Sequence, residues 1–233
     1  ASGNNIEEAI LHGILEIVER DAVVISEFNR LPIRKIMPDM LHPEVSGVIQ
    51  LLEDEGFFCS IASVPSDHPI PIISVFLRHR DNPANCSVAF GCHLDAFLAI
   101  SRALTEAIQL LPPSVNHEGW LNSGSPERYA AADTEMKPLR TLKNLASNDL
   151  KKNIETCVDI LKEVGTEVIV VDLSLPDIPF PAVRVLATRL QPVLRKGDMR
   201  FSPRFFEVPA KLGICSGPLH SNDVRIWPLC GYR

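Results

Sequence analysis

Residues 4–20 read NNIEEAILHGILEIVER and carry the clearest periodicity in the sequence. Apolar residues recur there at helical spacing, which predicts a helix over residues 5–28 with Asn4 or Asn5 as its N-cap. At about 100° per residue, Glu19 lies about 20° and Glu16 about 80° around the helix from Glu8. Three carboxylates therefore share the face opposite the apolar one.

A second helix, predicted over residues 94–111, carries a similar polar stripe. Arg102, Glu106 and Gln109 fall within about 60° of one another, on a helix otherwise rich in Ala, Leu and Ile. Each stripe is explained most simply as a solvated helix face. The alternative is a magnesium site. The first stripe contains no Lys to offset its carboxylates, and Mg²⁺ is commonly held by carboxylates together with substrate phosphates.

The rest of the chain predicts an α+β fold with a repeated unit. Residues 43–77 read as a helix ended by Gly56, a strand, a Pro-containing turn and a second strand. Residues 150–187 repeat this order, with Gly165 in the place of Gly56. We expect a pseudo-symmetric body of two helix–strand–strand units, with the two polar-striped helices lining the site. The alternative is a coincidence between two ordinary units.

Residues 1–233 are expected to form a single domain. Within it, residues 112–148 combine Gly, Pro and polar side chains and predict a mobile loop or lid, with a short helix around residues 127–132 as the alternative. Residues 191–233 are rich in Pro and Gly and predict an irregular tail.

Composition excludes several classes of protein. With 45% apolar and 22% charged residues, the chain is not disordered as a whole. A net charge of -6 with scattered Lys and Arg argues against nucleic-acid binding. No apolar run approaches the roughly 18 residues of a membrane span. We therefore expect a cytoplasmic protein that binds neither nucleic acid nor membrane.

Two segments closely resemble the signatures of the YcaO family, ATP-dependent enzymes that activate peptide backbone amides. The first is ASGNNIEEAILHG at residues 1–13 with EIVERDA at residues 16–22; the second is GCHLD at residues 91–95 with RALTEAIQ at residues 102–109. The resemblance covers roughly residues 1–190. It implies an ATP site without a P-loop, and the GxxxxGK[ST] pattern is indeed missing from the sequence.

The resemblance also implies roles for individual side chains. The implied magnesium ligands are Glu8, Glu16, Glu19 and Glu106. The implied contacts to nucleotide phosphates or polar groups are Asn4, Arg20, Arg102 and Gln109. The chemistry of these groups fits the roles, because carboxylates bind the metal, the metal binds triphosphate, and Arg presents forked donors to phosphate oxygens. No residue is assigned to the chemical step, and for His12 and His93 we expect a structural or supporting role.

The implied reaction is ATP-dependent phosphorylation of a peptide backbone amide oxygen, which leads to an azoline or a thioamide. The implied partners are a peptide or protein substrate and a protein that presents the substrate or delivers sulfur, and a homodimer is a further expectation. The alternative is a non-catalytic accessory or interaction module that keeps the fold, such as a ribosomal-protein methylthiolation accessory factor. A metal-dependent hydrolase is a third hypothesis, but no motif supplies its water-activating base.

Two departures from the family pattern matter. Residues 188–191 read TRLQ where the family usually has PGLE, and the tail lacks the repeated prolines of azoline-forming members. These differences argue against azoline formation in particular. The chain also begins at Ala1, inside the first signature, so we expect a fragment that lacks the N-terminal part of the family domain and holds one wall of the nucleotide site.

Overall fold

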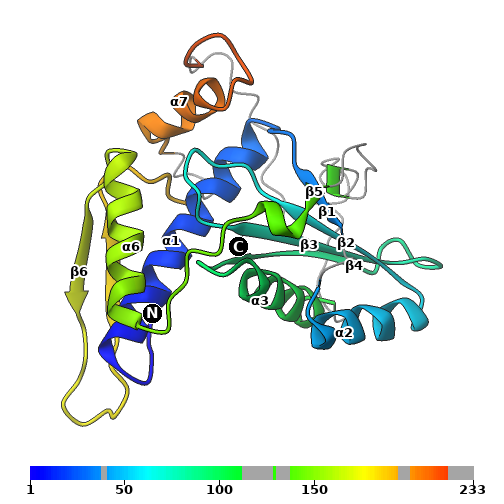
Figure 1. Ribbon diagram of the computed structural model, residues 1–233, viewed down its shortest axis with the longest axis horizontal. Helices are drawn as coiled ribbons and strands as arrows, with labels where there is room; N and C mark the ends of the chain where they lie inside the picture. The colour runs from blue at the N-terminus through cyan, green and yellow to red at the C-terminus, as the bar shows by residue number, and fades with distance from the viewer. Residues whose placement is uncertain (38–40, 112–127, 130–136, 194–199, 220–233) are drawn as a thin grey trace.

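The computed structural model describes residues 1–37, 41–111, 128–129, 137–193 and 200–219. They form the predicted mixed α+β fold, with one larger sheet and a separate two-stranded sheet (Figure 1). The helices are α1 (Ile6–Phe28), α2 (Pro43–Asp54), α3 (Ala96–Gln109), α6 (Leu150–Glu163) and α7 (Pro203–Lys211), with a 3-10 turn η2 (Leu139–Thr141). The strands are β1 (Arg34–Met37), β2 (Phe57–Ser63), β3 (Ile72–His79), β4 (Cys86–Cys92), β5 (Lys137–Pro138), β6 (Val168–Asp172) and β7 (Val183–Ala187). None of the described helices has the length and apolarity needed to cross a membrane.

The larger sheet has the order β4-β3-β2-β1-β5, antiparallel throughout except where β5 runs parallel to β1. Strand β3, which lies between β4 and β2, is buried over most of its length because α3 packs across β3 and β4. Gly91 on β4 permits this close packing, since a Cβ at that position would come within 2.2 Å of the Ala99 carbonyl oxygen of α3. The sheet therefore fixes the position of α3.

Helix α1 joins this sheet to the hairpin β6–β7, and Figure 1 shows it running between the two. Its apolar side is fully buried at Ala9, Ile14 and Val18. At Gly13 the helix approaches β7 so closely that a Cβ would lie 2.4 Å from a methyl group of Val185. Because α1 packs against both β4 and β7, its polar stripe is held at a fixed angle to α3.

The predicted helix–strand–strand order is found in both units. Helix α2 leads into the antiparallel pair β2–β3, and α6 leads into the antiparallel pair β6–β7. Gly56 and Gly165 end the two helices with φ of 85° and 77°, in the left-handed region that favours glycine. The surroundings differ, because β2 and β3 lie within the larger sheet whereas β6 and β7 form a sheet by themselves.

The prediction of an irregular tail over residues 191–233 is wrong for α7. Pro203 occupies the first turn of this helix, and Phe205 and Val208 are buried against the end of α1 and Leu31. The helix has only nine residues and contains Pro209, a residue that is rare inside helices, so the sequence did not indicate a helix there. Residues 194–199 and 220–233 of the predicted tail lie outside the described residues.

The predicted loop or lid is only partly described. Residues 112–127 and 130–136 lie outside the described residues, while Arg128 and Tyr129 are helical. Residues 137–148 are not simply a loop, because they contribute β5 to the larger sheet and the turn η2. Buried Leu139 fixes this segment against the core beneath α3.

Candidate functional site

Three of the four predicted metal ligands come together between α1 and α3. Burial, followed by the neighbouring carboxylates of Glu16 and Glu106, raises the pKa of Glu19 to about 8, against the lowering effect of Arg20 and Arg102. A like charge raises a carboxyl pKa only when it lies nearby. The polar stripes of the two helices therefore meet, and they bring these five side chains into one electrostatic group.

The carboxylates of this group differ in their partners. Arg20 donates from Nε to Glu16 Oε1 at 2.6 Å, one turn along α1. Glu19 and Glu106 make no hydrogen bond or ion pair with a described residue. Glu106 lies at the rim, where partial burial and then the Glu16 carboxylate raise its pKa above the usual range, against the lowering effect of Arg20. Two carboxylates thus form no ion pair within the described part of the chain, although Arg20 and Arg102 lie near enough to lower the pKa of Glu19.

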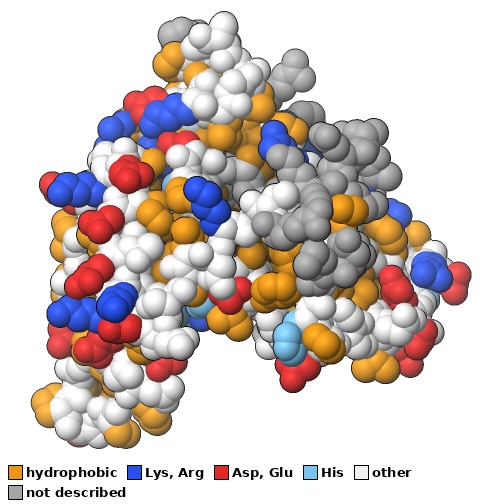
Figure 2. Space-filling view, viewed as in Figure 1, with side chains coloured by type: hydrophobic (Ala, Val, Ile, Leu, Met, Phe, Trp, Pro, Cys, Tyr) orange, Lys and Arg blue, Asp and Glu red, His pale blue; other side chains and the backbone are white. Residues whose placement is uncertain are grey.

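The exposed face of α6 shows what an ordinary solvated helix of this protein looks like. Side chains of both signs mix along it, and Figure 2 shows acidic and basic groups side by side on the left of the view. The stripe on α1 differs, because its half-buried Glu19 sits among other carboxylates at a raised pKa. A solvated face does not account for a carboxylate in that position.

Among the described residues, no group of three or more His, Cys, Asp or Glu side chains is assembled as a metal site. The donor set nevertheless fits magnesium. This ion is usually bound by one or two carboxylates, and waters and substrate phosphates complete its shell. Half-buried Glu19, held without a cation at a pKa of about 8, is a side chain that such an ion would stabilise in its charged form.

Glu8 lies apart from this group. Its Oε2 accepts hydrogen bonds from the backbone N and the Nδ2 of Asn4, at 2.9 and 3.0 Å, while Asn5 caps the helix by accepting from the Glu8 amide. Glu8 also precedes Glu16 by eight residues, which is about 12 Å along a helix. The structure therefore pairs Glu8 with Asn4 at the start of α1 and does not bring all four predicted ligands together.

The remaining predicted side chains lie on or beside α3. Exposed Arg102 influences Glu19 and also His93, whose pKa is lowered by burial and then by the Arg102 charge. His93 Nδ1 accepts from the Asp95 amide at 3.0 Å, a supporting contact at the start of α3. Gln109 is exposed at the end of α3 and makes no hydrogen bond with a described residue.

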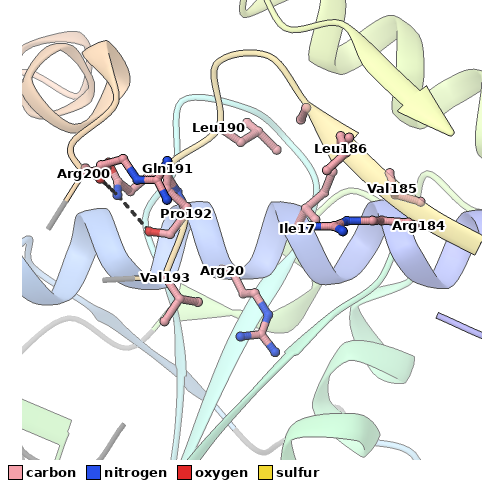
Figure 3. Close-up of a pocket in the computed structure, with 11 residues that line it drawn as sticks. Ile17, Arg20, Arg184, Val185, Leu186, Leu190, Gln191, Pro192, Val193 and Arg200 are labelled. Atoms are coloured by element: carbon pink, nitrogen blue, oxygen red, sulfur yellow. Dashed lines mark hydrogen bonds between the residues drawn. The ribbon is translucent and has the colours of Figure 1, made fainter. Parts of the chain in front are cut away.

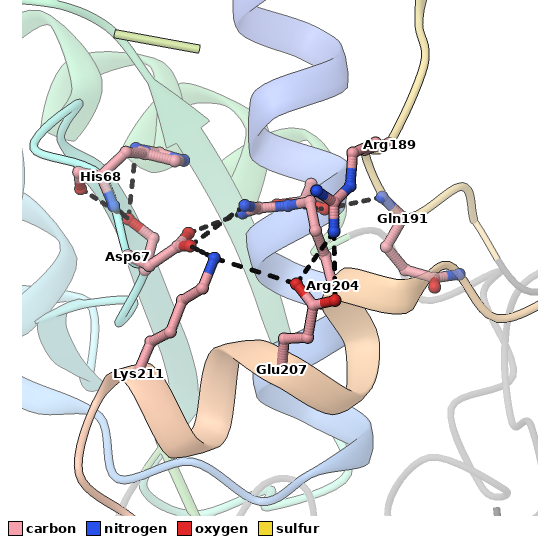
Figure 4. A network of polar contacts seen from close by, with 9 residues as sticks. Asp67, His68, Arg189, Gln191, Arg204, Glu207 and Lys211 are labelled. Carbon is pink, nitrogen blue, oxygen red and sulfur yellow. Dashed lines mark hydrogen bonds and ion pairs between the residues drawn. The ribbon is translucent and has the colours of Figure 1, made fainter. Parts of the chain in front are cut away.

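A buried ionic network, not predicted from the sequence, lies on the opposite face of α1 from Glu19 (Figure 4), because Asp21 follows Glu19 by two residues and thus by about 200° around the helix. Fully buried Arg204 on α7 donates from Nη2 to Asp21 at 2.8 Å and to Asp67 at 2.7 Å, and Lys211 reaches Asp67 at 3.2 Å. Although burial raises it, hydrogen bonds from Arg204 and Lys211 hold the pKa of Asp67 below its usual range. The network ties α7 to α1 and to the turn between β2 and β3. In the sequence, Asp21 is the one residue that indicates this network, because a carboxylate buried in a helix interface needs a cation as its partner.

A cavity of about 580 Å³ lies beside the carboxylate group (Figure 3). It is lined by α1, by β7 and by the chain on both sides of residues 194–199. Arg20, Arg184 and Arg200 contribute to its lining, and no Asp or Glu is found among the described lining residues. Arg20 belongs both to this lining and to the carboxylate group, so the two features adjoin. Neither Arg184 nor Arg200 stands in a motif that the sequence analysis singled out.

Comparisons with known proteins identify the family of the chain. A family model described as YcaO cyclodehydratase, ATP- and Mg²⁺-binding, matches residues 1–191. An uncharacterized protein of Methanothermobacter thermautotrophicus is 28% identical over 212 residues, which cover 82% of this chain and 54% of that protein. The chain thus spans about half the length of this curated relative.

Two solved structures are also similar. A heterocyclase in complex with substrate and cofactor is 25% identical with a TM-score of 0.86, over 99% of this chain and 32% of that one. The YcaO protein of Methanopyrus kandleri, bound with AMPPCP and Mg²⁺, shares the fold with a TM-score of 0.73 at 24% identity, over 87% of this chain and 58% of that one. Because the family model matches most of its length, the chain belongs to the YcaO family.

Proposed function

We propose that this protein uses ATP and Mg²⁺ to phosphorylate a backbone amide oxygen of a peptide, on the way to an azoline or a thioamide. The observation that carries the proposal is the meeting of Glu16, Glu19 and Glu106 from two helices, with Arg20 and Arg102 beside them. Support comes from the two solved relatives, one in complex with substrate and cofactor and one bound with AMPPCP and Mg²⁺.

The proposal assigns each side chain a task. Glu16, Glu19 and Glu106 would hold magnesium, and bound magnesium would neutralise charge on the triphosphate. Arg20 and Arg102 are placed beside these carboxylates, where their forked donors can bind phosphate oxygens. Catalysis of phosphoryl transfer depends on such positioning and charge stabilisation more than on a covalent step by the protein.

The proposal also includes the predicted site residues that lie outside the carboxylate group, namely Asn4, Glu8 and Gln109. Asn4 and Glu8 hold each other at the start of α1, and Gln109 follows Glu106 by about one turn of α3. We assign Glu8 to the metal and Asn4 and Gln109 to polar groups of the nucleotide. The pseudo-symmetric arrangement of the two helix–strand–strand units is likewise proposed, as the frame that sets α1 against α3.

Isothermal titration calorimetry with ATP, with and without Mg²⁺, tests the function. We expect binding that requires Mg²⁺ and that weakens at least about tenfold in Glu19→Gln, which corresponds to about 1.4 kcal/mol. Glu155→Gln, on the exposed side of α6, is the matched control and should bind as the parent does. ATP binding that does not depend on Mg²⁺, or that has the same affinity in Glu19→Gln as in the parent, would contradict the proposal.

The proposed partners are a peptide substrate and a protein that presents it or delivers sulfur. The second hypothesis is a non-catalytic accessory module. The calorimetry distinguishes it from the proposed enzyme, because an accessory module needs no magnesium-dependent ATP binding.

A further inference from the structure

We propose that His93 donates a hydrogen bond from Nε2 to a phosphate oxygen of the bound nucleotide, beside Arg102. The inference rests on the proposed function and adds to it a residue to which the family resemblance assigned no contact with the nucleotide. The supporting contact at the start of α3 involves only one of the two ring nitrogens of His93. The other ring nitrogen makes no hydrogen bond with a described residue.

The contact with Asp95 determines which ring nitrogen carries the proton. The Asp95 backbone N–H donates to His93 Nδ1 at 3.0 Å, so Nδ1 is the acceptor and the proton of the neutral ring lies on Nε2. Burial and then the Arg102 charge lower the pKa of His93, against the raising effect of Asp95, so the ring is neutral at neutral pH. The ring is half-buried, and Nε2 is not among the described side-chain atoms that are buried without a partner. His93 therefore has one accessible N–H donor that is left for a ligand.

The pairing of β4 places His93 on the same side of the larger sheet as α3. Its N–H donates to the Pro71 carbonyl at 3.3 Å, which continues the β3–β4 ladder by one residue beyond Cys92. Because side chains alternate along a strand, His93 lies on the same side of the sheet as Gly91. A Cβ at Gly91 would lie 3.1 Å from the Cβ of Arg102 on α3, the helix that packs across β4 (Figure 1). His93 and Arg102 are therefore neighbours.

Arg102 connects His93 to the proposed nucleotide site. On α3, Arg102 precedes Glu106 by about one turn, and its charge lowers the pKa of Glu19 on α1. On β4, Cys92 directly precedes His93, and burial and then the Glu19 carboxylate raise the pKa of the Cys92 thiol. Both neighbours of the His93 ring are therefore within the electrostatic reach of Glu19. His93 thus borders the carboxylate group together with Arg102.

The charges around His93 favour a phosphate oxygen as the acceptor. The triphosphate of ATP carries more oxygens than Mg²⁺ binds, and the remaining oxygens need N–H or O–H donors. A neutral imidazole next to Arg102 supplies such a donor without the repulsion that a second cation would bring. A backbone amide oxygen of a peptide is also an acceptor, but a hydrogen bond to an ionised acceptor is stronger. We therefore assign the His93 donor to the nucleotide.

Two substitutions separate the donor from the supporting contact. His93→Asn places an amide oxygen near the position of Nδ1, where it can still accept from the Asp95 N–H, and removes the donor at Nε2. His93→Gln places an amide N–H near the position of Nε2. In calorimetry with Mg-ATP on the complete protein, we expect His93→Asn to bind about tenfold more weakly than the parent, and His93→Gln to bind within about threefold of it. His42→Asn, at the exposed start of α2, is the matched control and should bind as the parent does.

A solely structural role of His93 predicts a different result. His93→Asn keeps the contact with Asp95 and would then bind Mg-ATP as tightly as the parent, which would overturn the inference. An unchanged affinity for Mg-ATP together with a loss of turnover on a peptide would place the donor on the peptide, and this result would overturn the inference as well. Circular dichroism shows whether each variant is folded.

Nuclear magnetic resonance of the parent with isotope-labelled histidine supplies a measurement that needs no substitution. The ring of His93 should be in its Nε2–H form in the free protein, and the Nε2 proton should exchange with water more slowly once Mg-ATP is added. An Nδ1–H form, or an Nε2 proton whose exchange does not slow on binding, would overturn the inference. A parent that does not bind Mg-ATP would contradict the proposed function and the inference together. A parent that binds Mg-ATP without any change at the His93 ring would contradict the inference alone.

Discussion

Glu19→Gln should make the metal-free protein more stable at alkaline pH. Glu19 has an ordinary pKa of 4.5 that rises to about 8 in the folded chain, because it is buried and lies near Glu16 and Glu106. Below pH 4.5 the side chain is protonated in both states and has no effect. As pH rises toward 8, the unfolded chain releases this proton and the folded chain keeps it, so stability falls; above pH 8 the loss is constant.

The size of the effect follows from linkage. At about 1.4 kcal/mol per pKa unit, a rise from 4.5 to about 8 corresponds to at most about 5 kcal/mol. Because the Glu19 side chain is only half-buried, water screens part of this value, so we expect Glu19→Gln to gain about 2–3 kcal/mol at pH 8.5. At pH 5 the gain should be below about 1 kcal/mol, because pH 5 lies only half a unit above the unfolded-state pKa of 4.5 and the stability difference has only begun to accumulate.

Urea unfolding at pH 5 and pH 8.5 measures these differences, with Glu155→Gln as the control that should show no pH-dependent gain. Repeating the pH 8.5 measurement with Mg²⁺ should narrow the difference, since the ion favours the charged carboxylate of the parent. A Glu19→Gln protein that gains nothing at pH 8.5, or gains as much at pH 5, would refute the placement of Glu19 beside two other carboxylates.

Two further predictions concern the frame around the site. Arg204→Met should lower the free energy of unfolding in urea by about 3–5 kcal/mol, because it leaves Asp21 and Asp67 buried without their cation. Lys211→Met, at the exposed end of the network, should lower it by less than about 1 kcal/mol. Equal losses in the two variants would show that the network does not anchor α7. Gly13→Ala should lower the free energy of unfolding by about 1–3 kcal/mol, because its Cβ would clash with Val185. Gly47→Ala on α2 has open space around it and should instead raise the free energy of unfolding by up to about 1 kcal/mol. A melting temperature that rises in Gly13→Ala would contradict the close packing of α1 on β7.

Much of the fold could be predicted because its elements show strong local periodicity. The helix predicted over residues 5–28 is found at Ile6–Phe28, and the two strands predicted within each of residues 43–77 and 150–187 are found as β2, β3, β6 and β7. The short strands β1 and β5 were not predicted, since two to four residues give no usable period. Helix α7 was missed for a different reason: Phe205 and Val208 become meaningful only when the end of α1 is placed beside them.

For the candidate site, too, the contacts that a local pattern encodes could be predicted, and those between distant residues could not. Helical geometry placed Glu16 and Glu19 on one face, and the resemblance joined them to Glu106, which the structure brings near. The same geometry grouped Glu8 with them by angle, but angle ignores the distance along the helix, and Asn4 holds Glu8 at its start. The pairing of Asp21 with Arg204 joins residues 183 positions apart, and no local pattern encodes it.

Two acidic side chains only two residues apart, on opposite faces of α1, show how this protein accommodates buried charge. Asp21 receives two hydrogen bonds from Arg204 and one from the Gln191 amide, so the chain itself supplies the partners of that carboxylate. Glu19, only two residues earlier, has no such partner among the described residues, and other carboxylates lie near it. A fold that needed only stability would gain by replacing Glu19 with a neutral side chain, as Glu19→Gln is expected to show. Retaining an unpaired carboxylate there makes physical sense if a cation from outside the chain binds it, because binding then converts the repulsion into stabilisation. The contrast between Asp21 and Glu19 therefore separates the structural face of α1 from the face that we propose binds Mg-ATP.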